Sequence, residues 1–164
     1  MRKISSDEIK NAVKNLFLQA CIAPNDDIEC ALKNAFETET NECARSILSQ
    51  IIENNRLAKA ENMPCCQDTG MAVVFLEIGQ EVFISGDYIE NAVNEGVREA
   101  YGEGYFRKSV LTPITRINTG DNTPAIIHTR IVPGDKIKIT AAPKGFGSEN
   151  MSAIKMCKPS EGAK

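Results

Sequence analysis

Seven consecutive residues, 64–70, carry more chemically useful side chains than any other stretch of this chain. Their order is Pro-Cys-Cys-Gln-Asp-Thr-Gly, so two thiols, an amide, a carboxylate and a hydroxyl follow one another. Helical periodicity precedes the stretch, and a β-branched apolar run at 72–76 follows it. Binding and catalytic side chains commonly lie on loops between rigid elements. The stretch therefore predicts a site that binds or converts a ligand.

Cys66 is the candidate metal ligand of this stretch. Cysteine thiolates bind soft metals and iron–sulfur clusters, and Cys66 stands beside the polar residues Gln67 and Asp68. One loop cannot hold a cluster, so further thiolates are needed from elsewhere. Cys157 is the other cysteine outside the helical region, while Cys65 is interpreted as a packing residue.

The remaining cysteines do not suggest a zinc site or disulfides. The chain has six cysteines but no C-x-x-C pair, which disfavours a self-contained zinc site. Nothing in the sequence indicates secretion, where paired cysteines are common. Three fall in predicted helices and are expected to be free thiols: Cys21, Cys30 and Cys43.

The triplet Asp68-Thr69-Gly70 leaves two further interpretations open. It matches the Asp-Thr-Gly triplet of aspartic proteases, in which two such aspartates share a proton. Those sequences have an apolar strand before the aspartate, whereas here Pro64-Cys65-Cys66-Gln67 precede it, and a second triplet would have to come from a homodimer. The simpler interpretation is a turn in which Asp68 bonds its own backbone and Gly70 adopts a positive φ.

A second candidate site is the glycine loop 144–150, Lys-Gly-Phe-Gly-Ser-Glu-Asn, which follows a predicted strand. Glycines let backbone N–H groups approach an anion, and a helix start favours negative charge. The loop lacks the Walker and dinucleotide patterns, so a small carboxylate or phosphate is expected instead of a nucleotide. Arg107 and Lys144 are candidate carboxylate ligands. His128, on a predicted strand, is interpreted as structural.

Composition excludes several functional classes. The 164 residues are 42% hydrophobic and 25% charged, which is ordinary for a globular domain. The net charge is −3 with no basic cluster, so nucleic acid is not an expected partner. No apolar run has the roughly 20 residues of a membrane span, and no signal peptide is evident. A cytoplasmic protein is the default expectation.

The periodicity predicts an α+β or mixed α/β fold of one domain, 1–164, with a helical region at 1–62 and a mixed α/β region at 63–164. Ser5 and Glu8 form a capping box for the first of three N-terminal amphipathic helices, which Pro24 ends. Asn25 or Asp26 caps the second helix, and residues 38–41 join it to the third.

Beyond residue 70 the predicted elements are two β-hairpins with a helix between them. Runs at 72–78 and 81–84 predict the first hairpin, and runs at 125–132 and 136–142 around Pro133-Gly134-Asp135 predict the second. Asp87 is the predicted cap of the intervening helix, and the tail is expected to begin another helix.

Four motifs occur in an order that resembles a known enzyme family. They are Cys66-Gln67-Asp68-Thr69-Gly70, Arg107-Lys108-Ser109, the run 118–125 (Asn-Thr-Gly-Asp-Asn-Thr-Pro-Ala) and the glycine loop 144–150. Together they resemble the class I, iron–sulfur-dependent hydro-lyases. More narrowly, the chain is similar to the α subunit of two-subunit fumarate hydratases and of L-tartrate dehydratase. The motifs do not separate fumarate from tartrate.

This resemblance implies roles for individual residues. Cys66 would be one of three thiolates of a 4Fe–4S cluster, whose fourth iron acts as a Lewis acid on the substrate. Asp68 would contact the substrate and handle a proton, and Gln67 and Arg107 would contact the substrate. Gly145, Phe146 and Gly147 would face a substrate carboxylate through backbone groups. The implied reaction is reversible addition of water to a small dicarboxylate: fumarate and malate, or tartrate and oxaloacetate.

One departure from the family pattern affects the expected activity. The family's other two cluster cysteines and a catalytic histidine lie well downstream of the glycine loop, whereas this chain ends at Lys164. The expectation is therefore an N-terminal part of an α subunit, inactive by itself and oligomeric when complete. A β subunit or C-terminal domain is the expected partner. The alternative is a truncated, non-catalytic homologue that binds a partner subunit or a small anion.

Overall fold

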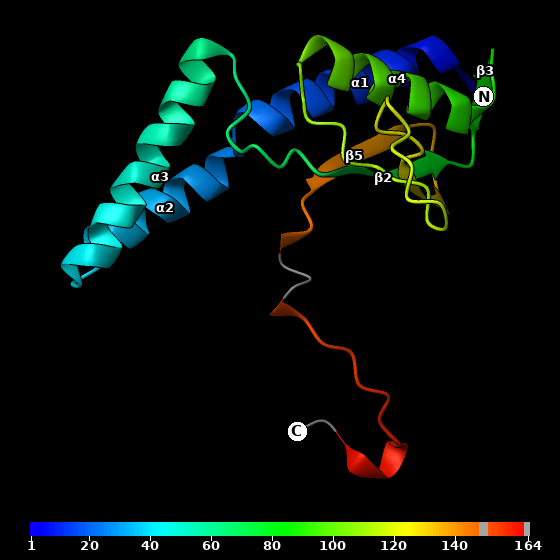
Figure 1. Cartoon of the computed structure of the whole chain (residues 1–164). Helices are drawn as coiled ribbons and strands as arrows, with labels where there is room; N and C mark the ends of the chain where they lie inside the picture. Colours follow the sequence, from blue (N-terminus) through cyan, green and yellow to red (C-terminus); the bar gives the residue numbers. More distant parts are fainter. Residues whose placement is uncertain (148–150, 163–164) are drawn as a thin grey trace.

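The computed structural model describes residues 1–147 and 151–162, in which helices and mixed sheets occur together (Figure 1). The elements follow in the order β1 (Arg2–Ser5), α1 (Ser6–Ile22), α2 (Asp26–Thr38), α3 (Glu42–Glu61), β2 (Met71–Gly79), β3 (Val82–Ser85), α4 (Ile89–Glu103), β4 (Ile126–Val132), β5 (Ile137–Lys144) and the short 3₁₀ helix η2 (Pro159–Glu161). This content confirms the predicted α+β or mixed α/β class.

The core lies between a helix pair and one face of a sheet. Helices α1 and α4 run side by side over strands β2 and β5 (Figure 1). Their apolar stripes meet the inward side chains of β2, and removal of this apolar surface from water is the main stabilising contribution. The fully or nearly fully buried side chains include Ile9, Val13 and Phe17 of α1, Val74 and Leu76 of β2, and Val93, Val97 and Tyr101 of α4.

The strand pairing differs from the two predicted hairpins. Strand β2 is central in a three-stranded sheet of order β4-β2-β5, parallel to β4 and antiparallel to β5. Strand β3 pairs instead with β1, an element that the sequence patterns did not predict. Both predicted hairpins are therefore wrong, although the strands themselves are present.

The turn between β4 and β5 explains this arrangement. It crosses the end of β2, where the N–H of Gly79 donates to the carbonyl of Lys136 (2.8 Å) and the N–H of Gln80 donates to the carbonyl of Val132 (2.8 Å). The two strands flanking the turn consequently lie on opposite sides of β2.

The predicted helices are present with small shifts at their ends. The Ser5–Glu8 capping box is confirmed: the Ser5 N–H donates to the Glu8 carboxylate (2.8 Å), and the Glu8 N–H donates to the Ser5 hydroxyl (3.2 Å). Asn25 is the N-cap of α2. Helix α4 begins one residue later than predicted, with Tyr88 as its N-cap, because the Asp87 carboxylate accepts from the Tyr88 N–H (2.7 Å) instead of capping the helix as predicted.

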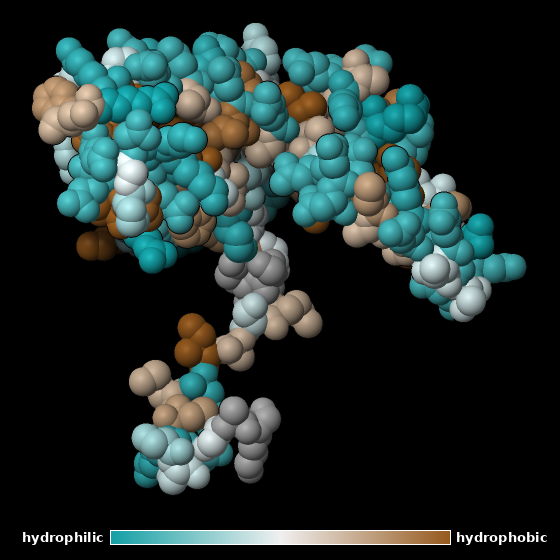
Figure 2. Space-filling model, turned by 180° about the vertical axis from the view of Figure 1, so that it is seen from behind, coloured by the Kyte–Doolittle hydropathy of each residue, from teal (hydrophilic) through white to brown (hydrophobic). Residues whose placement is uncertain are grey.

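Two segments extend from this body. Helices α2 and α3 form a projecting hairpin in which Ala58 of α3 is the single buried residue (Figure 1). In the tail, residues 152–158 form no helix, so the predicted tail helix is wrong there, and the short 3₁₀ helix η2 follows them. Figure 2 shows hydrophobic side chains along this tail, where Met151, Ile154 and Met156 are more than 90% exposed.

Candidate active site

The Asp68 carboxylate joins the Cys66–Gly70 motif to the glycine loop. Its Oδ1 accepts from the Gly70 N–H (3.1 Å), and its Oδ2 accepts from the Phe146 N–H (3.2 Å), although Asp68 and Phe146 are 78 positions apart. The sheet register causes this proximity, because the start of β2 pairs with the end of β5, with Met71 opposite Lys144. The predicted turn at Asp68 and the glycine loop, the second candidate site, are thus parts of one arrangement.

Two glycines permit this close approach. Gly70 has a φ of +67°, and a Cβ atom at this position would lie 2.3 Å from the carbonyl carbon of Lys144. A Cβ atom on Gly145 would lie 3.0 Å from the Asp68 Oδ2. Side chains at these positions would separate the two loops, so the glycines are required by the contact between them.

Arg107 reaches the same region through the backbone. The Thr69 hydroxyl donates to the Arg107 carbonyl (3.0 Å), and the Tyr101 hydroxyl donates to the Thr69 carbonyl (2.7 Å). Burial, with a smaller contribution from Cys21, raises the pKa of Tyr101 far above its usual range, which keeps the phenol a donor. The Arg107 side chain is exposed and forms no ion pair with a described carboxylate.

The two adjacent cysteines have different surroundings. Cys66 is exposed, and its Sγ lies 3.5 Å from the Gln67 Oε1. Cys65 is half-buried: its N–H donates to the Cys21 carbonyl (3.0 Å), and its own carbonyl accepts from the Asn54 side chain (2.8 Å). Burial, together with the neighbouring Cys66, raises the pKa of the Cys65 thiol. The position of Cys66 suits a metal ligand, whereas that of Cys65 suits packing.

The other predicted residues lie around this cluster or away from it. Gln67 and Gly147 are exposed, and Phe146 is 43% exposed with the Lys144 ammonium 5.9 Å from its ring centre. Ser148, Glu149 and Asn150, the end of the predicted glycine loop, are outside the described residues.

Two residues considered as candidates lie elsewhere. His128 stacks on Phe75 at 5.0 Å on the sheet face opposite the helices, and Cys157 lies on the extended tail. Residues 63–70 contain no strand, so the strand that precedes the aspartate in aspartic proteases is not found here. The protease interpretation therefore has no support from the local fold.

The sequence patterns missed two buried residues that organise the cluster, Tyr101 and Asn122. Tyr101 ends the apolar stripe of α4 and was indistinguishable from a core residue by periodicity. Asn122 belongs to the polar run 118–125 that had been noted without a role, and its side chain is fully buried. Ser109, between them in sequence, has a buried hydroxyl oxygen with no hydrogen-bond partner among the described residues.

Metal ligands are sparse around Cys66. Within residues 1–147 and 151–162, no group of three or more His, Cys, Asp or Glu side chains could hold a metal ion. The described part of the chain thus offers one suitably exposed thiol at this site. In the same described part, no helix is both long and apolar enough to cross a membrane.

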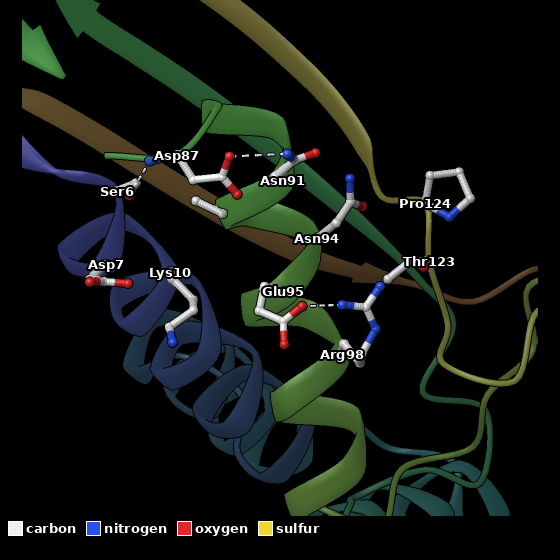
Figure 3. Close-up of a pocket in the computed structure, with 11 residues that line it drawn as sticks. Ser6, Asp7, Lys10, Asp87, Asn91, Asn94, Glu95, Arg98, Thr123 and Pro124 are labelled. Atoms are coloured by element: carbon white, nitrogen blue, oxygen red, sulfur yellow. Dashed lines mark hydrogen bonds and ion pairs between the residues drawn. The ribbon is translucent and has the colours of Figure 1, made fainter. Parts of the chain in front are cut away.

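A separate polar cleft lies near the beginnings of α1 and α4. Figure 3 shows it between the two helices and the loop that carries Thr123 and Pro124, with a volume of about 560 Å³. Its basic side chains already have partners: Arg98 pairs with Glu95 and Asp121, and Lys10 pairs with Glu99. Asp68, Arg107 and Phe146 do not line this cleft.

Comparisons with known proteins agree with the motif order. The family described as fumarate hydratase (Fumerase) matches residues 10–164. A Methanocaldococcus jannaschii protein assigned as an L(+)-tartrate dehydratase subunit alpha is 42% identical, over 94% of this chain and 56% of that protein. The anaerobic class I fumarate hydratase of Escherichia coli K12 is 33% identical, over 72% of this chain and 22% of its own length. The chain thus spans about half or less of the length of these relatives.

Proposed function

The chain belongs to the fumarate hydratase (Fumerase) family, and on this basis we propose that it forms part of a hydro-lyase that reversibly adds water to a small dicarboxylate. The substrate pairs are fumarate and malate, or tartrate and oxaloacetate. The relatives' names support both pairs, since they include an L(+)-tartrate dehydratase subunit alpha and class I fumarate hydratases.

The Asp68 carboxylate, held between two loops, is the main structural support for this function. The N–H groups of Gly70 and Phe146 fix the orientation of both its oxygens. Such an oriented carboxylate can accept a proton from the carbon next to a substrate carboxylate. Arg107 is held near Asp68 by the bond from the Thr69 hydroxyl to the Arg107 carbonyl. Its exposed guanidinium supplies the positive charge that pairs with a substrate carboxylate. Gln67 contacts the same substrate in this proposal.

The glycine loop completes the anion site. Gly145 and Phe146 lie against Asp68, and the Phe146 N–H is bonded to the Asp68 carboxylate. In this proposal the neighbouring backbone of Gly145 and Gly147 faces a carboxylate of the substrate. A dicarboxylate has one negative group at each end, so Arg107 and the backbone of residues 145–147 can each bind one of them. This two-point binding orients the substrate relative to Asp68.

A 4Fe–4S cluster is the proposed cofactor, and one residue of the described chain fits it. Cys66 is exposed on the loop next to Asp68, as a ligand position requires, whereas the half-buried Cys65 is bonded into the body. A cluster iron without a protein ligand supplies Lewis acidity toward a substrate hydroxyl. The other thiolates must come from polypeptide other than the described residues.

A partner polypeptide is therefore part of the proposal. Relatives named as alpha subunits belong to multi-subunit tartrate dehydratases, and this chain covers 56% and 46% of two of them. We expect a β subunit or further domain that adds cluster ligands and substrate contacts, in an oligomeric enzyme. The expected location is the cytoplasm, where thiols stay reduced, and all six cysteines are free.

Arg107 provides the test of substrate binding, with Lys108 as the matched control. The protein is isolated anaerobically from its own cells with the polypeptides that bind it, and fumarate hydration and tartrate dehydration are measured. Arg107→Ala should raise KM by about 10- to 100-fold, because it removes a bidentate carboxylate partner. Lys108→Ala removes an equal charge from the next residue and should change KM less than about threefold.

The iron content separates this role from a structural one. Arg107→Ala should retain the wild-type iron content, since the guanidinium binds substrate and not the cofactor. Loss of iron together with activity would make Arg107 a structural residue. A colourless complex that binds malate without converting it would instead support a non-catalytic homologue that binds an anion.

A further inference from the structure

Asn122 uses both ends of one buried side-chain amide to join two loops. Its Nδ2 donates to the Gly70 carbonyl (3.0 Å), and its Oδ1 accepts from the N–H groups of Ser109 (2.8 Å) and Val110 (3.2 Å). The residue is fully buried and has a φ of +64°. Asparagine tolerates this left-handed backbone better than most residues, and its amide provides a donor and an acceptor together.

The two loops that Asn122 joins are those that carry the proposed substrate groups. Asp68 precedes Gly70 by two residues, and Arg107 precedes Ser109 by two residues. One further bond joins these loops, from the Thr69 hydroxyl to the Arg107 carbonyl (3.0 Å). A shift of either loop at Asn122 therefore changes the separation between the Asp68 carboxylate and the Arg107 guanidinium.

The segment that contains Asn122 is itself fixed to helix α4. Before it, the Asp121 carboxylate accepts from the Arg98 guanidinium (2.9 Å) and from the Thr123 hydroxyl (2.7 Å). After it, the N–H of Ala125 donates to the Asn94 side chain (2.8 Å). Through its own segment, Asn122 therefore anchors both loops to helix α4 of the core.

We infer that Asn122 is a positioning residue that sets the distance and orientation between Asp68 and Arg107. This inference rests on the proposed function for the roles of those two groups. Asn122 touches neither substrate nor cofactor in this arrangement. It determines the distance between Asp68 and the carbon from which Asp68 removes a proton, in a dicarboxylate bound at Arg107. A purely structural Asn122 would stabilise the whole fold without any specific effect on these loops.

Amide hydrogen exchange in this chain separates the two roles. Asn122→Gly keeps the backbone conformation accessible while removing all three bonds. The amides of Ser109 and Val110, which donate to Asn122 directly, should exchange at least tenfold faster. The Gly70 amide, which donates to Asp68, should exchange faster because its loop is no longer held through the Gly70 carbonyl. Asn122→Asp with an ionised carboxylate retains the acceptor but loses the donor to the Gly70 carbonyl. Ser109 and Val110 should therefore stay protected, while the loop of Gly70 loosens and its N–H, bonded to Asp68, exchanges faster. Amides at the centres of α1 and α4 should be unchanged in both variants.

Asn118 provides the matched control. Its side chain donates to the Lys108 carbonyl (2.8 Å), so it contacts the same loop, but from the exposed side. Asn118→Gly should leave the exchange of Ser109 and Val110 unchanged. An Asn122→Gly variant that exchanges faster evenly through helices and loops, or that leaves Ser109 and Val110 protected, would overturn the inference.

A kinetic measurement on the native complex extends the test to the reaction. Asn122→Asp should lower kcat by about 10- to 100-fold with a KM within about threefold of the wild type, because misplacement of Asp68 affects the reaction more than binding at Arg107. Full activity with loosened loops would contradict the positioning role. Absence of hydration and dehydration in the wild-type complex would instead contradict the proposed function, while the exchange result would still decide whether Asn122 joins the loops.

Discussion

Cys65 and Cys66 are adjacent in the chain, but their thiols differ in burial and therefore in how readily they can bind a metal. The N–H and carbonyl of Cys65 are both bonded to the body, and its thiol is half-buried near Cys21, itself buried with its pKa raised to about 12. Cys66 projects into solvent one residue later. Thiolates bind metal and thiols do not, so the exposed residue is the better ligand.

Substitution of each cysteine by serine tests this assignment. In the complex isolated anaerobically, Cys66→Ser should lose most of its iron and activity together, because a cluster ligand is removed. Cys65→Ser should retain both, with a stability loss of about 1 kcal/mol from a changed half-buried contact. Iron analysis and urea unfolding measure these two effects, and equal iron losses in the two variants would show that the ligand was chosen wrongly.

Asp121 gives the stability of the chain a defined dependence on acid pH. Although burial alone would raise the pKa of Asp121, the Thr123 hydroxyl and the Arg98 guanidinium lower it to about 2, from an ordinary value of 3.8. A carboxyl whose pKa is lower in the folded state stabilises the fold above its unfolded pKa, and this contribution is lost as the pH falls.

The expected loss lies between about pH 4 and pH 2 and amounts to about 1–2 kcal/mol. Urea unfolding across this range should show the free energy of unfolding decreasing less steeply in Asp121→Asn than in the wild type. Identical slopes in the two proteins would mean that the Arg98 and Thr123 contacts do not stabilise the charged form in solution.

Sequence patterns identified part of the site at the level of residues. Asp68, Gly145 and Phe146 were predicted from local signals, a turn-forming triplet and a glycine loop, and the structure brings them together. The positions of Tyr101 and Asn122 could not be predicted, because their partners are backbone carbonyls and N–H groups far along the chain. The type of a side chain does not reveal which distant backbone group that side chain will bond.

At the scale of elements, the contact between α1 and α4 determines the shape of the core. A Cβ atom on Gly96 would lie 2.5 Å from the Lys10 carbonyl oxygen and 3.1 Å from the Val13 Cβ, so the helices approach closely at this point. A Cβ atom on Gly102, near the end of the same helix, would have no atom within 4 Å apart from its chain neighbours and the backbone of its own helix. Helix α4 therefore has one glycine with no room for a side chain, Gly96, and one with open space beside it, Gly102.

Alanine substitution at these two glycines should change stability in opposite directions. Gly96→Ala should destabilise the fold by about 1–3 kcal/mol, because the added methyl group forces α1 and α4 apart. Gly102→Ala should be neutral or stabilise the fold by up to about 1 kcal/mol through helix propensity. Thermal unfolding of the two variants measures the difference, and a stabilising Gly96→Ala would show that the helices pack less closely than described.

The strands show why element type was easier to predict than pairing. Apolar and β-branched runs located β2, β3, β4 and β5 within a few residues, because local side-chain pattern reflects burial. The pairing depends on where the turn at 133–136 crosses β2 and on the N-terminal β1, which are non-local relations. Helices were predicted better, since their caps and stripes are contained within one element.

At the scale of the whole molecule, much apolar surface of the described chain has no partner within it. The α2–α3 hairpin has one buried residue, and the tail exposes Met151, Ile154 and Met156. Exposed apolar surface of this kind is a common feature of protein–protein contacts, and it supports the partner polypeptide proposed above. The relatives that it resembles are about twice its length or longer.

We propose that this chain contributes Cys66, Asp68 and Arg107 to a cluster-dependent hydro-lyase. The most direct measurement is anaerobic isolation of the chain from its own cells with its bound polypeptides, followed by iron and sulfide analysis and by assays of fumarate hydration and tartrate dehydration. We expect bound iron and sulfide and reversible turnover of one dicarboxylate, both lost in Cys66→Ser. A complex without iron, or one whose turnover is unchanged in Cys66→Ser, would contradict this proposal.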